Sequence, residues 1–224
     1  MPTISSATLQ ATLAAIQRHW AAAETALGRA IVLKSGTGLA QLTALHQTVS
    51  AIALAQVTPE NQRQAAALTR DTTRTAVRAV NSRLVTSVRG LLPETEFVAQ
   101  LPALPTSNAL AEKQLRAARD LESIWTSINA LPENRYPSVK PPLTILVKED
   151  GATNALTLAN YSARIAAYET AQSTIRQLDE TLATLNLRRD DAIKKARKAL
   201  TEYRAAIRAL FPEDSEQVQT LPKL

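Results

Sequence analysis

The sequence predicts a mostly α-helical fold, a tandem-duplicated long-helix bundle or antiparallel coiled coil with a small two-stranded β-ribbon. First, Val-Arg-Gly-Leu-Leu-Pro-Glu at residues 88–94 recurs as Ile-Arg-Ala-Leu-Phe-Pro-Glu at residues 207–213, 119 positions later. Second, only 5 of the 224 residues are glycine and only 4% are aromatic, although 45% are hydrophobic, which favours long and closely packed helices. Third, long stretches carry apolar residues three and four apart, the period of an amphipathic helix.

The duplication divides the chain into two repeats, residues 1–105 and 106–224. At the same offset, Leu68, Arg70, Asp71 and Arg78 of the first repeat align with Leu187, Arg189, Asp190 and Arg197 of the second. Both repeats have the same order of elements, a helix, a strand and a long helix. Because duplicated helical units tend to bury their apolar faces against each other, we expect one pseudo-twofold body.

The first repeat opens with a predicted helix at residues 6–27, whose apolar residues have heptad spacing and which Gly28 ends. Residues 30–33 are short and β-branched, which predicts a strand. The Lys-Ser-Gly-Thr-Gly segment at residues 34–38 superficially suggests a phosphate loop. It has too few glycines and no helix-leading lysine after it, so it is interpreted as a plain turn.

Each repeat ends in a long helical stretch. In the first repeat the helical period runs from Leu39 to Pro93, either as two helices separated at Pro59 or as one helix kinked there. In the second repeat, residues 158–210 contain neither proline nor glycine, which supports a single helix of 53 residues. Such a length is rare in compact domains, so a break near Asn186 is the alternative.

The second repeat also contains the clearest strand, residues 143–147, which follows a predicted helix at residues 108–131 and a proline-rich segment. A lone strand cannot satisfy its backbone groups, so we expect it to pair with residues 30–33 across the pseudo-twofold. The open edges of this ribbon would accept a strand from a protein partner or from a second copy of the chain. The candidate partner-binding residues are Ile31, Leu33, Ile145 and Val147.

Two Arg-Asp pairs are candidates for a polar layer between the long helices. Arg189 falls on the apolar seam, and Arg70 holds the matching place in the first repeat, with Asp190 and Asp71 beside them. Burial would require each arginine to bind a carboxylate, and the layer would fix the helix register, so that Arg189→Leu alters register or oligomeric state. The alternative is that both side chains extend to solvent.

The net charge of +6 is concentrated in the repeated segments: residues 59–93 carry six basic and two acidic residues, and residues 176–211 carry nine and five. A possible anion-binding set consists of Lys194, Lys195, Arg197, Lys198 and Arg204. These cations flank both sides of the seam, and no aromatic residues alternate with them to stack on bases, which favours a solvated helix face.

The chain contains no cysteine and only two histidines, and no catalytic or metal-binding motif is present. We therefore expect a non-enzyme without catalytic residues, cofactor or metal. The first residues do not form a signal peptide, and no apolar stretch approaches the ~20 residues of a membrane span, so we expect a cytoplasmic protein without a membrane partner. The expected function is a helical scaffold or adaptor that binds a protein partner or itself. Nucleic-acid or anionic-surface binding is the alternative, and an enzyme with a pocket between the repeats is the third possibility.

Overall fold

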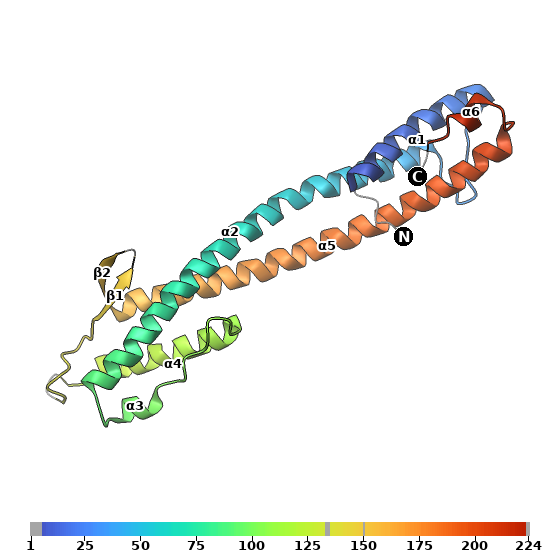
Figure 1. The fold of residues 1–224 in the computed structure, drawn as a ribbon. Coiled ribbons are helices and arrows are strands. Elements are labelled where there is room, and N and C mark those ends of the chain that lie inside the picture. Colours follow the sequence, from blue (N-terminus) through green and yellow to red (C-terminus); the bar gives the residue numbers. More distant parts are fainter. Residues whose placement is uncertain (1–5, 133–134, 150, 223–224) are drawn as a thin grey trace. The chain divides into compact units, whose positions relative to one another are not determined.

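The structure is a computed structural model that describes residues 6–132, 135–149 and 151–222. It is mostly helical with one small antiparallel sheet, which confirms the predicted fold class (Figure 1). The helices are α1 (Ser6–Leu27), α2 (Leu39–Leu91), α3 (Glu96–Gln100), α4 (Ala111–Asn129), α5 (Leu158–Leu210) and α6 (Glu216–Gln219), and the strands are β1 (Ile145–Glu149) and β2 (Ala152–Leu156).

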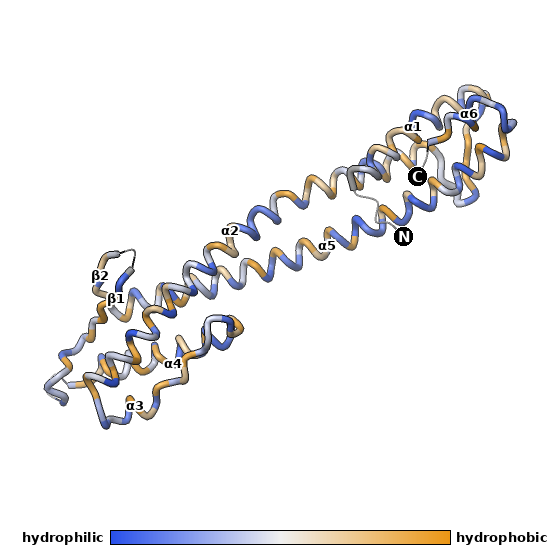
Figure 2. Tube along the Cα trace, viewed as in Figure 1, coloured by the Kyte–Doolittle hydropathy of each residue, from blue (hydrophilic) through white to orange (hydrophobic). Residues whose placement is uncertain are grey.

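The two long helices, α2 and α5, each run for 53 residues without a break. The alternatives of a division at Pro59 or near Asn186 are therefore excluded, and Pro59 lies buried inside α2 although it removes one backbone hydrogen bond. Both helices begin and end at positions that the duplication aligns. Figure 2 shows hydrophobic and hydrophilic residues alternating along both of them, as in amphipathic helices.

Both long helices also begin with the same capping contact. The backbone N–H of Gly38 donates to Oε1 of Gln41 over 3.0 Å, and that of Thr157 donates to Oδ1 of Asn160 over 3.1 Å. These contacts satisfy donors that the first helical turn leaves without a partner. The agreement extends the duplication beyond the segment in which the two sequences are visibly alike.

The packing divides the chain into two compact units that are not the two sequence repeats. Unit 1 comprises Met1–Asn61 and Asp179–Leu224, and unit 2 comprises Gln62–Leu178. Each unit therefore combines the first part of one repeat with the last part of the other. The boundary at residue 105 describes the duplicated sequence, whereas each core is assembled from both repeats.

The core of unit 1 surrounds Trp20 of α1. The indole stacks on the ring of Tyr203 of α5, with centroids 4.3 Å apart and planes inclined by 14°. Offset stacking of this kind adds to the gain from burial itself. Around these rings lie buried aliphatic residues from α1, the segment that follows it, α2 and α5: Leu13, Ile16, Ala23, Ile31, Leu33, Leu42, Ala196, Ala199, Leu200 and Ile207.

The core of unit 2 surrounds Trp125 of α4 in the equivalent way. Its ring centroid lies 5.6 Å from that of Tyr161, which comes from the start of α5. The Tyr161 hydroxyl donates to Oδ1 of Asn81 on α2, and burial raises the pKa of this tyrosine far above its ordinary value. The phenol therefore stays neutral, and its hydrogen bond connects two helices within the unit.

The two cores contain the same tyrosine–leucine pair at matched positions, but with the two residues exchanged. The duplication aligns Tyr161 with Leu42 and Tyr203 with Leu84, and all four side chains are fully buried. Unit 1 contains Tyr203 from the end of one long helix and Leu42 from the start of the other. Unit 2 contains Tyr161 from a start and Leu84 from an end. At these two matched positions each core thus has one tyrosine and one leucine, which conserves the packed volume there, although the core of unit 2 also buries Tyr168.

The predicted strand at residues 30–33 is wrong. The N–H of Ile31 donates to Oε1 of Glu24 over 2.9 Å, and the N–H of Leu33 donates to the carbonyl of Thr37 over 2.8 Å across a turn in which Gly36 has φ +78°. Because the chain reverses immediately after Leu33, only the bond between Leu33 and Thr37 forms, and no ladder of strand hydrogen bonds follows it. The second repeat has the same anchor, since the N–H of Leu143 donates to Oδ1 of Asn129 over 2.8 Å.

The predicted pairing between the two repeats is also wrong, because β1 pairs with β2 in a local hairpin. Leu33 and Thr37 of the first repeat correspond to Ile145 and Leu156 of the second, where the connection is longer and forms the hairpin. The sequence did not predict β2 because Leu156 is its only buried side chain. A strand with a single buried residue lacks the alternating apolar pattern on which strand prediction depends.

We predict that Tyr203→Leu destabilises the protein by about 2 kcal/mol, because the core loses ring volume and the stacking contact. Leu42→Tyr alone should cost about 1–3 kcal/mol, because it overfills the same core. The double variant reproduces in unit 1 the arrangement of unit 2, so its loss should be at least ~1 kcal/mol smaller than the sum of the single losses. Urea unfolding measures all three, and simple additivity would contradict the exchange.

Candidate functional site

The β1–β2 hairpin is the candidate site, and its first strand overlaps the strand that the sequence predicts at residues 143–147. Its turn contains Gly151 with φ +83°, and its register pairs Glu149 with Ala152 and Ile145 with Leu156. Positive φ in a two-residue turn matches the twist of the flanking strands. The hairpin lies in the connection between α4 and α5 (Figure 1).

One face of the hairpin is part of the core of unit 2. Ile145 and Val147 are 1% and 4% exposed, and they pack in the same cluster as Trp125. Ile31 and Leu33 are likewise buried, in the core of unit 1. The four side chains that the sequence assigned to partner binding therefore stabilise their own units, and any interaction through the hairpin must use its backbone edges.

The register determines which backbone groups point outward. In a two-residue hairpin the residues that flank the turn exchange two hydrogen bonds, and every second pair along the ladder does the same. Glu149 and Ala152 form such a pair, so the N–H and C=O groups of Thr153 and Ala155 point away from β1. On β1 the outward groups belong to Leu146 and Lys148.

The outer edge of β1 is partly covered by α2. Nε of Arg83 donates to the carbonyl oxygen of Leu146 over 3.1 Å. A pocket of about 560 Å³ lies along this edge, and its lining consists of Ala79, Ser82, Arg83, Thr86, Leu146, Val147, Lys148 and Thr153. The guanidinium occupies the acceptor that a further strand would need, so β1 is a poor template for strand addition.

The outer edge of β2 is open. Within the described ranges, the outward N–H and C=O groups of Thr153 and Ala155 have no backbone partner. The side chains of residues 152–155 are exposed, and the strand Ala-Thr-Asn-Ala-Leu carries neither charge nor proline. Charges, prolines and bulges are the usual protection of edge strands, so β2 is chemically able to accept another strand.

The predicted polar layer forms only in part. Both arginines bind a carboxylate in equivalent settings, as predicted, but the side chains of Arg70 and Arg189 keep 30% and 33% of their surface exposed and are therefore only partly buried. Each binds the carboxylate of the next residue: Nε of Arg70 donates to Asp71 over 2.9 Å, and that of Arg189 to Asp190 over 3.3 Å. The hydrogen bond raises the pKa of Arg70 and lowers that of Asp71. A bond between chain neighbours cannot set the register of two helices.

Four of the predicted anion-binding residues, Lys194, Lys195, Arg197 and Lys198, are exposed on α5, and Arg204 is partly buried. Lys195 and Lys198 line a pocket with α2. The helical repeat of 100° per residue places Arg197 and Arg204 on the other flank and Lys194 between the two flanks. Anion binding by this set stays a prediction.

His19 has a structural role beside the core of unit 1. Its ring lies between the hydroxyl of Tyr203, 2.6 Å from Nδ1, and the carbonyl of Gln217, 2.8 Å from Nε2. A carbonyl can only accept, so Nε2 carries the hydrogen, and in the neutral ring Nδ1 accepts from the tyrosine. Burial raises the pKa of Tyr203 well above its ordinary value. This chain of bonds joins α1, α5 and α6 within unit 1.

Comparisons with known protein families, with curated proteins and with solved structures find no match to this chain. In the part of the chain that the structure describes, no helix has both the length and the apolar character needed to cross a membrane.

Arg189→Leu tests the revised view of the polar layer. Because the ion pair is local and partly exposed, we expect the free energy of unfolding to change by less than ~1 kcal/mol and the oligomeric state to stay the same. Urea unfolding and sedimentation velocity measure the two quantities. A change of oligomeric state would restore the register role that the sequence suggested.

The orientation of the hairpin edge makes a second prediction. Ala155→Pro removes an outward donor and should change the free energy of unfolding by less than ~1 kcal/mol. Asn154→Pro removes the donor that faces Val147 and should cost about 1–3 kcal/mol, because a buried carbonyl loses its partner. Thermal and urea unfolding compare the two variants, and equal losses would contradict the assigned register.

Proposed function

We propose that the chain is a non-enzymatic helical scaffold that assembles with a second copy of itself through the open edge of β2. The observation that carries the proposal is a strand with free outward donors and acceptors at Thr153 and Ala155 and with no protecting charge or proline. The second copy presents the same edge, so the interface is isologous and closes on itself.

The register of the hairpin specifies how two such edges fit. With the twofold axis at Asn154, Thr153 of one chain lies opposite Ala155 of the other, and each such pair exchanges two hydrogen bonds. The order of the joined sheet is then β1, β2, β2 and β1. On the outward face small residues oppose each other, which allows the close approach of neighbouring strands.

Nucleic-acid binding has less support as an alternative. The exposed cations of α5 have no exposed aromatic residues among them that could stack on bases. An extended peptide from another protein would use the same β2 edge, but nothing in the strand favours a particular foreign side chain. A second copy of the chain, unlike a foreign peptide, is present wherever the chain is present and carries the same β2 edge.

Association of the full-length chain tests the proposal. We expect a reversible monomer–dimer equilibrium in sedimentation and light scattering, weakened at least about tenfold by Ala155→Pro, which removes donors from two of the four interchain bonds. Ala155→Thr keeps the N–H and is the matched control, with an association close to that of the wild type. A wild-type chain that stays monomeric at all concentrations, or a proline variant that dimerises normally, would refute the proposal.

A single cysteine tests the register directly, because the chain has none of its own. Asn154→Cys places two thiols directly opposite each other in a non-hydrogen-bonded pair, where the Cα atoms are ~4.5 Å apart and a disulfide can form. Thr153→Cys places its thiols on a diagonal of roughly 7–8 Å and should link poorly under the same oxidant. Equal cross-linking of both variants would contradict the twofold at Asn154.

A further inference from the structure

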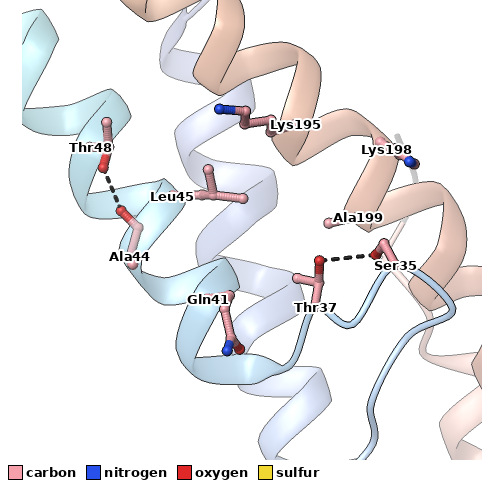
Figure 3. Close-up of a pocket in the computed structure, with 9 residues that line it drawn as sticks. All are labelled: Ser35, Thr37, Gln41, Ala44, Leu45, Thr48, Lys195, Lys198 and Ala199. Atoms are coloured by element: carbon pink, nitrogen blue, oxygen red, sulfur yellow. Dashed lines mark hydrogen bonds between the residues drawn. The ribbon is translucent and has the colours of Figure 1, made fainter.

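Unit 1 contains a pocket of about 410 Å³ that is separate from the hairpin (Figure 3). Three segments form it: the turn at residues 34–38, the first turns of α2, and α5. Its lining consists of Ser35, Thr37, Gln41, Ala44, Leu45, Thr48, Lys195, Lys198 and Ala199. The volume falls within the range of small-molecule sites.

One end of the pocket is rich in hydrogen-bond donors. The hydroxyls of Ser35 and Thr37 lie 3.0 Å apart and share one hydrogen bond, and the Ser35 side chain also bonds to Glu202. Oε1 of Gln41 accepts from the N–H of Gly38, which leaves the amide Nε2 as a donor. Figure 3 shows these side chains across from α5, which carries Lys195 and Lys198.

Three cations and two carboxylates lie at this end, which leaves a net charge of +1. Lys195 and Lys198 each pair with a carboxylate, and Lys34 is close enough to Glu202 to interact with its charge. Asp191 pairs with Lys195, but both side chains are mostly exposed, and such pairs are weak and readily exchanged for a ligand. Glu202 accepts from the N–H of Ser35 over 3.1 Å, and its hydrogen bonding to Ser35 lowers the pKa of this carboxyl. Glu202 is therefore an ionised anchor for the turn, and it lies 4.0 Å from Lys198.

The other side of the pocket is apolar. Ala44 and Leu45 of α2 and Ala199 of α5 contribute only hydrocarbon groups to the lining. A single phosphate would leave this part unfilled. The division into a cationic, donor-rich end and an apolar side matches a small molecule that joins an oxyanion to a compact apolar group.

The duplication supplies an independent observation. Unit 2 has a pocket in the corresponding place, lined by Asp71, Thr72, Thr75, Ala76, Ala79, Lys148 and Arg164. There Ala76 and Ala79 align with Lys195 and Lys198, but Arg164 stands where unit 1 has Leu45. Both pockets thus have two cationic side chains, although different positions supply them and the unit 2 lining also includes Asp71.

We propose that the unit 1 pocket binds a small organic phosphate. The phosphate oxygens accept from Lys195, Lys198 and Nε2 of Gln41, and the organic part lies against Leu45 and Ala199. Charge-assisted bonds to an ammonium are the strong contacts in such a site. The inference does not depend on the function of the hairpin, so Ala155→Pro should bind the same ligand normally.

Phenyl phosphate is a suitable probe for the full-length protein, with amide chemical shifts as the readout. We expect saturable shifts at residues 35–48, with affinity reduced about tenfold by Lys198→Ala, because one charge-assisted hydrogen bond is lost. Lys194→Ala removes the same charge from the same helix outside the pocket and should change affinity by less than about twofold. Asp191→Asn frees Lys195 and should raise affinity about threefold.

Comparison with inorganic phosphate tests the apolar half of the site, since phenyl phosphate should bind more tightly. Equal affinity for the two probes would overturn that half of the proposal. An equal loss in Lys194→Ala and Lys198→Ala would show attraction by net charge and overturn the site. Shifts confined to residues 71–79, or none at all, would also refute binding in unit 1. Circular dichroism of each variant verifies that its helical content is unchanged.

Discussion

Each unit buries its tryptophan only by drawing on both repeats, and the rest of the structure depends on this constraint. α1 supplies Trp20, but the ring that stacks on it belongs to Tyr203, near the other end of the chain. α4 supplies Trp125, and the core around it is completed by the end of α2. Contacts between such distant residues cannot form within one repeat. The same constraint accounts for the length of the 53-residue helices, because each of them contributes buried residues to unit 1 and to unit 2.

The helical part of the fold could be predicted because its signal is periodic and repeated. The apolar spacing along residues 39–91 and 158–210 predicted helical structure in both stretches, with a division at Pro59 or near Asn186 left open, and the repeated segment aligned them. The ribbon could not be predicted in the same way. Residues 30–33 have the composition of a strand, but the Glu24 side chain takes the N–H of Ile31 and the chain turns back at once. Side chains supplied from elsewhere in the fold override such local preferences.

The sequence can reveal the partners of a site residue only when those partners lie close to it along the chain. The turn at residues 34–38 was interpreted as a plain turn, because nothing nearby in the sequence brings a cation to it; the fold brings Lys195 and Lys198 from α5. Conversely, Arg189 looked like a seam residue, yet its guanidinium bends to Asp190 and stays partly exposed. An arginine side chain is long enough to leave the seam to which its Cα belongs.

The exchange of tyrosine and leucine has a consequence for how the two halves of the gene product depend on each other. Both tyrosines, Tyr161 and Tyr203, belong to the second repeat, and both leucines, Leu42 and Leu84, belong to the first. Two free copies of the second repeat would place two tyrosines in every core, and two copies of the first would place two leucines there. One assembly would be too crowded and the other too loose. The halves have become complementary partners that can no longer replace each other, and the peptide link between them keeps their ratio at one to one.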